Sequence, residues 1–228
     1  MSINVFHRRR NALINSGTAI PIANLVHYYR LNADANDSVA TLHGTATDIT
    51  YTSGKTGNAS TYNGSSSKIQ IPNGIWATNP DEISISGFFK ATNNTSAYRF
   101  VSINDGSLRP FTYLRYNTGS ADNITALART GDVLSSASFD TTTWLYLTIT
   151  AVKGGAVKLY VNGVEVDSGT NTNFSNTTPT NNFLGSSRTG ISVFFNGQMF
   201  GVGFWDKALT SDEVLAAFNK QNAGNHLI

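Results

Sequence analysis

The chain has 228 residues, of which 40% are hydrophobic and only 13% are charged, and it contains three glutamates and no cysteine. This composition excludes coiled coils, helical bundles, helix-rich α/β enzymes and disulfide scaffolds, whereas the 11% of aromatic residues argues against a disordered chain. The formal net charge is +2, but without the first ten residues 13 basic side chains face 14 acidic ones, a net charge of −1, so we expect no nucleic-acid partner.

The first predicted element is an arm, residues 1–24. It contains Arg8, Arg9 and Arg10, then a polar stretch, and it lacks apolar periodicity. We interpret the three arginines as an assembly contact with a partner protein; a frayed terminus and a weak phosphate-binding patch are the alternatives. No apolar segment follows the arginines and no stretch approaches 18 apolar residues, so we expect neither a signal peptide nor a membrane span.

Residues 25–228 are predicted to form one β domain of short strands separated by turns. Apolar and polar side chains alternate along several segments, as they do in strands with one buried face. These segments are residues 68–71, 83–88, 111–116, 145–150 and 158–166. Residues 194–205 form a longer apolar stretch punctuated by glycines, which we predict as a further strand.

Two local patterns give more specific predictions. Asn162-Gly163 separates two strand segments and suits the positive φ angles of a type I′ turn, so we predict a two-residue hairpin. Thr210 and Glu213 have the spacing of a capping box and precede an apolar helical face, so we predict one short helix there.

Three aromatic residues are expected in the core of the domain. Phe88, Trp144 and Tyr160 each lie in or beside a predicted strand, where large apolar side chains are usually buried.

The order of these segments resembles that of laminin G-like domains, which are jelly rolls of the concanavalin A-like lectin and glucanase type. The matching blocks are residues 25–31, 36–38, 54–59, 62–67, 83–90, 144–148, 159–164, 195–197 and 204–210, followed by the capped helix. Phe88 stands where the family usually has tryptophan. The resemblance covers residues 25–220 and implies an all-β fold, a two-sheet antiparallel jelly-roll sandwich with one short C-terminal helix, but it does not fix the function.

The resemblance raises the question of glycoside hydrolysis. Glucanases of this fold carry two or three carboxylates at alternate positions of one strand. Glu165 and Asp167 have that spacing, but they leave a tight hairpin, where exposed charges discourage edge pairing. Glu82 lies beside a predicted turn and Glu213 in the helix cap, so we assign no catalytic residue.

Related domains often hold calcium, with one ligand from the acidic loop after the first strand. Asn36 and Asp37 occupy that loop, but Phe200 and Gly201 stand where the second acidic ligand would lie. We therefore expect no metal and no other cofactor, and we interpret Asp37 as the first residue of an Asx turn with Ser38.

Sugar binding would need an exposed aromatic side chain next to hydrogen-bonding groups. The candidates are Trp76, Tyr98, Tyr113 and Tyr116. For each of them core packing or a strand-edge contact is favoured over ligand stacking, so the sequence leaves the sugar-binding residues unknown.

We expect a non-enzymatic structural or adhesion protein. A short basic arm before one neutral, Asn/Thr/Ser-rich β domain is typical of an accessory protein of a bacteriophage virion, such as a capsid decoration, a head fibre or a tail component, and residues 6–13 resemble the starts of some virion proteins of Bacteroidetes phages. This interpretation places the protein in the virion as an oligomer, bound through its arm to other virion or surface proteins, with a glycan as a further candidate ligand. The alternative is a free carbohydrate-binding module of a bacterial surface or secreted system.

Overall fold

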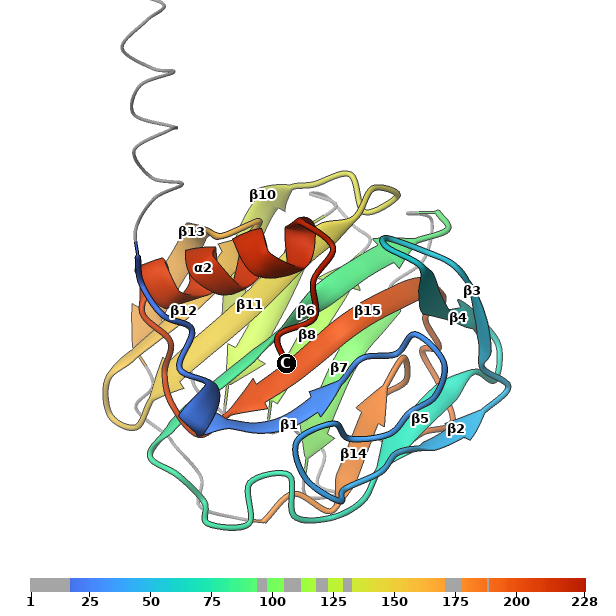
Figure 1. Ribbon diagram of the computed structural model, residues 1–228, viewed down its shortest axis with the longest axis horizontal. Helices are drawn as coiled ribbons and strands as arrows, with labels where there is room; N and C mark the ends of the chain where they lie inside the picture. The colour runs from blue at the N-terminus through green and yellow to red at the C-terminus, as the bar shows by residue number, and fades with distance from the viewer. Residues whose placement is uncertain are drawn as a thin grey trace, which may run out of the picture.

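Two antiparallel β-sheets stacked face to face make up the body of the protein (Figure 1). The computed structural model describes residues 17–93, 98–104, 112–117, 123–128, 133–170, 178–187 and 189–228. Within these residues, one short C-terminal α-helix accompanies the sheets, which agrees with the predicted jelly-roll sandwich. None of the described helices is long and apolar enough to cross a membrane.

The larger sheet, here sheet A, has the strand order β13-β12-β11-β6-β15-β4-β3, and β1 pairs with β15 beside this path. Its strands are β1 (Leu25–Tyr29), β3 (Thr50–Ser53), β4 (Asn58–Asn63), β6 (Glu82–Ala91), β11 (Leu145–Val152), β12 (Ala156–Val161), β13 (Val164–Thr170) and β15 (Asn196–Trp205).

The second sheet, here sheet B, has the strand order β10-β9-β8-β7-β14-β5-β2. Its strands are β2 (Thr45–Thr47), β5 (Lys68–Ile71), β7 (Tyr98–Asn104), β8 (Thr112–Asn117), β9 (Asn123–Ala128), β10 (Val133–Ser138) and β14 (Asn181–Leu184).

The main core lies between the two sheets. Aliphatic side chains from both inner faces interdigitate there with rings such as Phe89, Phe100 and Phe195, which lie about 5 Å apart, centroid to centroid. Burial of this many apolar side chains is the main force that holds the sheets together.

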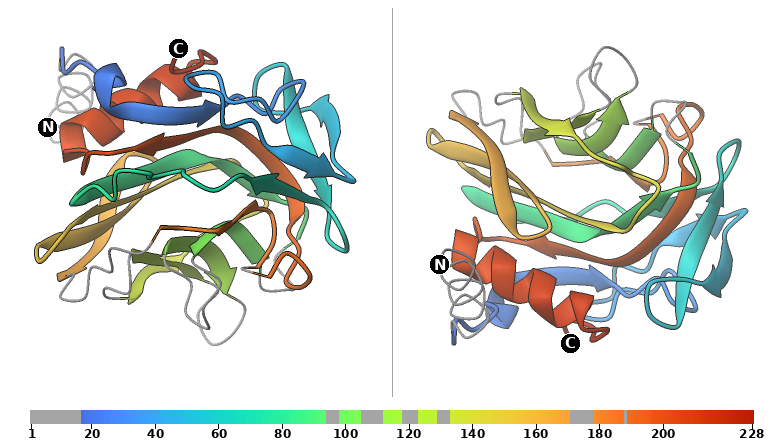
Figure 2. Two further views of the ribbon diagram at one scale, coloured as in Figure 1. Left: turned by 90° about the horizontal axis from the view of Figure 1, so that it is seen from below. Right: turned by 90° about the horizontal axis from the view of Figure 1, so that it is seen from above.

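A second apolar cluster covers part of the outer face of sheet A. The helix α2 (Ser211–Asn222) and the C-terminal residues lie across this face, as Figure 2 shows from two sides. Phe88, Tyr146 and Phe200 from the sheet pack there with Val214 and Ala217 of the helix. The central strand β6 is therefore buried on both faces, whereas the alternating sequence pattern predicted a strand with one buried face.

Both local predictions are confirmed. Asn162 and Gly163 have φ angles of 52° and 82° and join β12 to β13 as a two-residue hairpin. The hydroxyl of Thr210 accepts a hydrogen bond from the backbone N–H of Glu213, and the Glu213 carboxylate accepts one from the backbone N–H of Thr210, which completes the capping box.

Strand β15 changes partners halfway along its length. Residues 196–199 pair with β4, and residues 202–205 pair with β1, with an irregularity between them. Gly201, with φ at 63°, lies in this irregularity, and its backbone N–H bonds to the carbonyl of Arg30. This change of partner divides the outer face of sheet A into two halves, one near β1 and α2 and the other near β3 and β4.

The described part of the predicted arm, residues 17–24, lies against the domain. Ile20 packs on the second cluster, and residues 22–24 form the short 3-10 helix η1 (Ile22–Asn24). Asn24 Nδ2 donates to Asp206 Oδ1 at 3.1 Å. Arg8, Arg9 and Arg10 lie outside the described residues, so their role in assembly stays a prediction.

Candidate functional site

Two of the four candidate aromatic residues, Trp76 and Tyr98, are buried. Trp76 and Tyr98 are 2% and 3% exposed, and the indole N–H of Trp76 donates to the backbone carbonyl of Trp205 at 3.1 Å. Both rings belong to the main core, so core packing is the correct interpretation for them. Tyr113 and Tyr116 belong to β8, but their side chains lie outside the described part of the structure.

Trp144 differs from its expected place in the core. Phe88 and Tyr160 are buried as predicted, but Trp144 is only partly buried and lies at the margin of the second cluster. Its ring meets the ring of Phe88 edge to face, with centroids 6.5 Å apart. Part of the indole is therefore open to solvent on the outer face of sheet A.

A pocket of about 290 Å³ opens on this face at the end of β6; we call it the Lys90 pocket. Trp144 is not part of its lining, but it directly precedes Leu145, which pairs with Phe89 next to Lys90. Phe89 and Ala91 of β6 point into the main core, and Phe88 points into the second cluster. Because side chains alternate along a strand, Lys90 shares the outer face with Phe88. The lining consists of Thr61, Lys90, Ala91, Thr92, Thr142, Gly197 and Gln198.

The neighbouring strands fix the amide of Gln198 at one side of the pocket. Gln198 lies opposite Lys90 on β6 and opposite Thr61 on β4. Its Nε2 donates to Thr52 Oγ1 at 3.1 Å, to the backbone carbonyl of Ser53 at 2.9 Å and to Thr61 Oγ1 at 3.3 Å. These bonds occupy the amide N–H groups, so Oε1 is the atom that Gln198 offers to a ligand.

A turn before β11 forms the opposite side of the pocket. Asp140 Oδ1 accepts hydrogen bonds from the hydroxyl and the backbone N–H of Thr142. The hydrogen bond from the Thr142 hydroxyl, and to a smaller extent the one from its backbone N–H, lowers the pKa of the exposed Asp140 carboxyl below its usual value. Thr142 is held in place by these bonds, and the adjacent Thr141 accepts a hydrogen bond from the backbone N–H of Ala91 at 2.7 Å.

Two lysines lie on this part of the sheet. Lys90 is the one charged residue among the seven that line the pocket. Lys55, from the loop between β3 and β4, places Nζ 4.5 Å from the centroid of the Phe88 ring, a cation–π contact. Partial burial lowers the pKa of Lys55 below its usual value.

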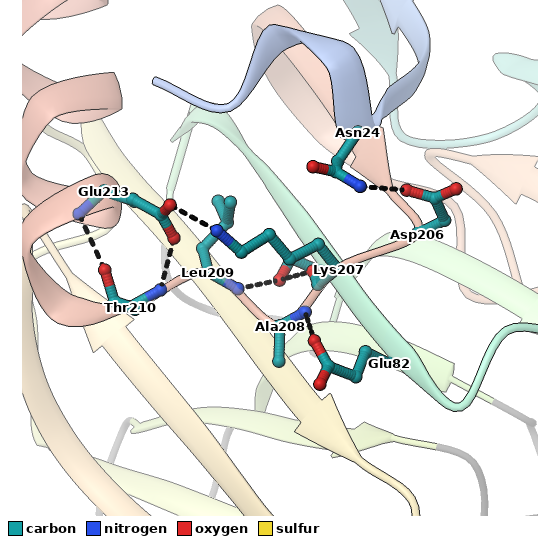
Figure 3. Close-up of polar contacts among 9 residues, drawn as sticks. Asn24, Glu82, Asp206, Lys207, Ala208, Leu209, Thr210 and Glu213 are labelled. Carbon is teal, nitrogen blue, oxygen red and sulfur yellow. Dashed lines mark hydrogen bonds and ion pairs between the residues drawn. The ribbon is translucent and has the colours of Figure 1, made fainter. Parts of the chain in front are cut away.

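Two of the three glutamates hold the connection between β15 and α2 (Figure 3). Glu82 accepts a hydrogen bond from the backbone N–H of Ala208 at 3.1 Å, and Glu213 bonds to Lys207 and Thr210. The third, Glu165, pairs with Lys158 Nζ at 2.9 Å on the exposed face of the hairpin. None of the three glutamates lines the Lys90 pocket.

Asp37 is a buried structural carboxylate. Its Oδ2 lies 2.7 Å from Nδ1 of His27, and its Oδ1 accepts from the backbone N–H groups of Tyr28 at 3.1 Å and Val39 at 3.0 Å. Burial alone would raise the pKa of Asp37, but the bonds from His27 and the backbone hold it well below its usual range. The bond to Val39 closes the predicted Asx turn around Ser38, and both oxygens are already in use.

The described residues contain no group of three side chains that could hold a metal ion. Phe200 is buried in the second cluster and stacks on His226, with ring centroids 4.9 Å apart. The positions that resembled a calcium site are thus occupied by packing and by backbone hydrogen bonds.

A second pocket, of about 310 Å³, lies at the other end of sheet A between β1 and the segment before β6. Its lining is mostly apolar and consists of Val26, His27, Gly74, Ile75, Trp76, Ala77, Thr78 and Asp206. Asp206 is the one carboxylate of this lining, and it accepts a hydrogen bond from Asn24.

Sequence reasoning did not identify Lys90 or Gln198 as site residues. Both interrupt strongly apolar strands at positions that face outward, and that interruption is the signal that could have found them. Their proximity could not be read from the sequence, because 108 positions separate them along the chain and the sheet pairing brings them opposite each other.

Comparisons with known proteins agree with the observed fold. The family model Laminin_G_3, described as the concanavalin A-like lectin/glucanases superfamily, matches residues 63–215. A search of curated proteins found no match.

Several solved structures share the fold. Domain 4 of AbnA, an extracellular arabinanase from Geobacillus stearothermophilus solved with arabinotriose, superposes with a TM-score of 0.67 at 24% identity, covering 85% of this chain and 97% of that one. A Trypanosoma rangeli sialidase with bound 2,3-difluorosialic acid gives a TM-score of 0.71 at 14% identity and covers 90% of this chain but 34% of the sialidase.

Botulinum neurotoxin type C, whose cell entry depends on two ganglioside molecules, gives a TM-score of 0.67 at 12% identity, covering 89% of this chain and 53% of the toxin chain. At these identities the structural matches establish a shared fold. The family model spans more than half of the chain, so the chain belongs to the Laminin_G_3 family of the concanavalin A-like lectin/glucanases superfamily.

Proposed function

We propose that this protein is a non-enzymatic adhesion domain that binds a glycan in the Lys90 pocket. One observation carries the proposal: a lysine, a glutamine and three threonines line one pocket, and the partly exposed Trp144 lies two residues from Thr142 of that lining. Binding sites for small molecules typically combine a concave surface with a few fixed polar groups in this way.

The chemistry of the pocket suits a sugar. A sugar hydroxyl both donates and accepts a hydrogen bond, so a pair of neighbouring hydroxyls can accept from Lys90 Nζ and donate to Gln198 Oε1. The partly exposed ring of Trp144 offers an apolar surface to the C–H groups of the same sugar. The fixed positions of Gln198 and Thr142 reduce the loss of side-chain entropy on binding.

A non-enzymatic role is supported by the placement of the carboxylates. Glycoside hydrolysis by two carboxylates requires that they flank one bond, about 5–10 Å apart. The Lys90 pocket has no carboxylate in its lining, and the second pocket has only Asp206. We expect no new reducing ends after prolonged incubation with a bound glycan.

The proposed setting is the surface of a phage virion, in which residues 1–24 tether the domain as a capsid decoration, head fibre or tail component. The arginine run at residues 8–10 supports this setting, since clustered arginines suit contacts with carboxylates of a partner. A bacterial cell-surface or secreted glycan-binding system is the second candidate, supported by the lectin-type fold.

A glycan microarray followed by calorimetry tests the proposed site. We expect Gln198→Ala and Trp144→Ala each to weaken binding about tenfold, which corresponds to about 1.4 kcal/mol. Gln70→Ala removes an exposed amide from sheet B and is the matched control, expected to bind like the wild type. Absence of glycan binding, or equal binding by all variants, would contradict the proposal.

A further inference from the structure

We infer that the Lys90 pocket selects saccharides that carry a carboxylate over their neutral counterparts. This inference deepens the proposed function and rests on it. The observation behind it is that Lys90, the one charged residue of the lining, forms no ion pair within the described residues.

Most lysines in the described part of the chain have a partner. Lys153, Lys158 and Lys207 form ion pairs with carboxylates. The ammonium groups of Lys68 and Lys220 donate to backbone carbonyls at 2.6 Å.

Lys55 and Lys90 are the exceptions. Within the described residues, Lys90 Nζ forms no hydrogen bond or ion pair, and Lys55 Nζ has only the face of the Phe88 ring. No carboxylate of the described residues thus uses the ion-pairing capacity of either lysine.

These two cations share one face of the sheet. Lys90 follows Phe88 by two residues on β6, so their Cα atoms are about 7 Å apart and their side chains point the same way. Lys55 lies over the Phe88 ring. A carboxylate that binds Lys90 Nζ forms a charge-assisted hydrogen bond, which is about twice as strong as a neutral one.

One carboxylate lies close to the pocket. Asp140 bonds to Thr142 of the lining, and it forms no ion pair with Lys90. This carboxylate is exposed, so water and salt screen its charge more effectively than they screen the partly buried Lys90. Lys90 is therefore the least screened charge at the pocket, and it is positive.

The experiment compares matched ligands. Galacturonic acid oligomers and the same oligomers reduced to galactose differ only in the carboxylate, and a microarray of further acidic and neutral pairs covers other sugar frameworks. We expect the best acidic ligand to bind the wild type roughly tenfold more tightly than its neutral counterpart at low salt. This preference should shrink as sodium chloride rises from about 0.05 M to 0.5 M.

Variants of the protein test whether the preference for acidic saccharides comes from Lys90. We expect Lys90→Gln to weaken the acidic ligand about tenfold and the neutral one less than threefold, Lys90→Arg to retain the preference, and Asp140→Asn to strengthen acidic binding. Lys158→Gln removes a lysine that is already paired on the hairpin and should change neither affinity. Circular dichroism and melting temperatures establish that each variant is folded.

The outcomes distinguish a failure of the inferred carboxylate preference from a failure of the proposed glycan site. If Lys90→Gln weakens both ligands equally, or if the acidic preference survives in Lys90→Gln, the inference is overturned and the proposed glycan site stands. If no glycan binds, both fall together.

Discussion

At the scale of single residues, Asp37 shows how one side chain can organise a loop. It joins the ring of His27 to backbone groups on both sides of the loop after β1, and its side chain is fully buried. A buried carboxylate is stable only when donors surround it, so the loop and the charge depend on each other.

The first prediction concerns the pH dependence that Asp37 imposes. The folded-state pKa of Asp37 is depressed, so its contribution to stability is complete above about pH 5 and is lost as the pH falls below the unfolded value of about 3.9. We expect Asp37→Asn to lower the free energy of unfolding by about 1.5–3 kcal/mol at pH 7 and to flatten the loss of stability on acidification. Urea titrations between pH 3 and 7 measure both effects.

The control for this prediction is Asp81→Asn. Asp81 pairs with Lys153 at 3.0 Å on the surface, where its side chain is 70% exposed, so we expect a change within about 1 kcal/mol. An Asp37→Asn protein as stable and as sensitive to acid as the wild type would show that the charge does not organise the loop.

At the scale of elements, the packing of α2 on β15 depends on a close approach of the helix to the backbone at Gly201. Gly201 adopts a left-handed φ, and a Cβ added there would lie 2.5 Å from Gln221 Oε1 of the helix and 2.9 Å from the hydroxyl of Tyr28 on β1. The absence of a side chain at this position lets the strand change partners beneath the helix.

The second prediction separates this close approach from backbone strain. Gly57 has nearly the same φ, 66°, but nothing lies within 4 Å of an added Cβ. We expect Gly57→Ala to destabilise the protein by about 1–2 kcal/mol through its left-handed backbone alone. Gly201→Ala should cost about 1–3 kcal/mol more, because the helix must also shift. Equal losses in chemical denaturation would show that Gln221 and Tyr28 adapt freely.

The elements also show what the sequence can and cannot predict. The hairpin at Asn162-Gly163 and the cap at Thr210 were predictable because each depends on residues within a few positions of one another. Burial of both faces of β6 was not predictable, since it depends on a helix more than 100 residues away. The partial exposure of Trp144 was missed for the same reason: tertiary contacts decide which aromatic ring is covered.

At the scale of the whole molecule, residues 17–24 lie at the boundary between the predicted arm and the domain. Ile20 contributes to the second cluster, and Asn24 joins the start of β1 to the end of β15 through Asp206. These contacts predict that residues 17–24 contribute to the stability of the domain.

The third prediction is a pair of truncations. Removal of residues 2–16 should leave the melting temperature and glycan binding unchanged, while incorporation into the proposed particle is lost with the arginines. Removal through residue 24 should also lower stability by about 1–3 kcal/mol, since it takes away the apolar surface of Ile20 and the bonds of Asn24. Thermal melts and co-purification with particles measure the two effects.

Normal assembly of the shorter truncation would place the attachment surface on the β domain itself. Unfolding of the same truncation would show that residues 2–16 belong to the sandwich, and the boundary between arm and domain would then be wrong.

The outer face of sheet A is divided into a half that α2 covers and a half that carries the Lys90 pocket, and this division has an evolutionary consequence. The polar side chains of Thr61, Lys90, Thr142 and Gln198 belong to neither apolar cluster. A substitution of Lys90, which forms no hydrogen bond or ion pair within the described residues, therefore changes the charge of the proposed site at little cost to folding. For a protein with the proposed function, this separation allows descendants of the sequence to change ligand by point mutation while the same scaffold persists.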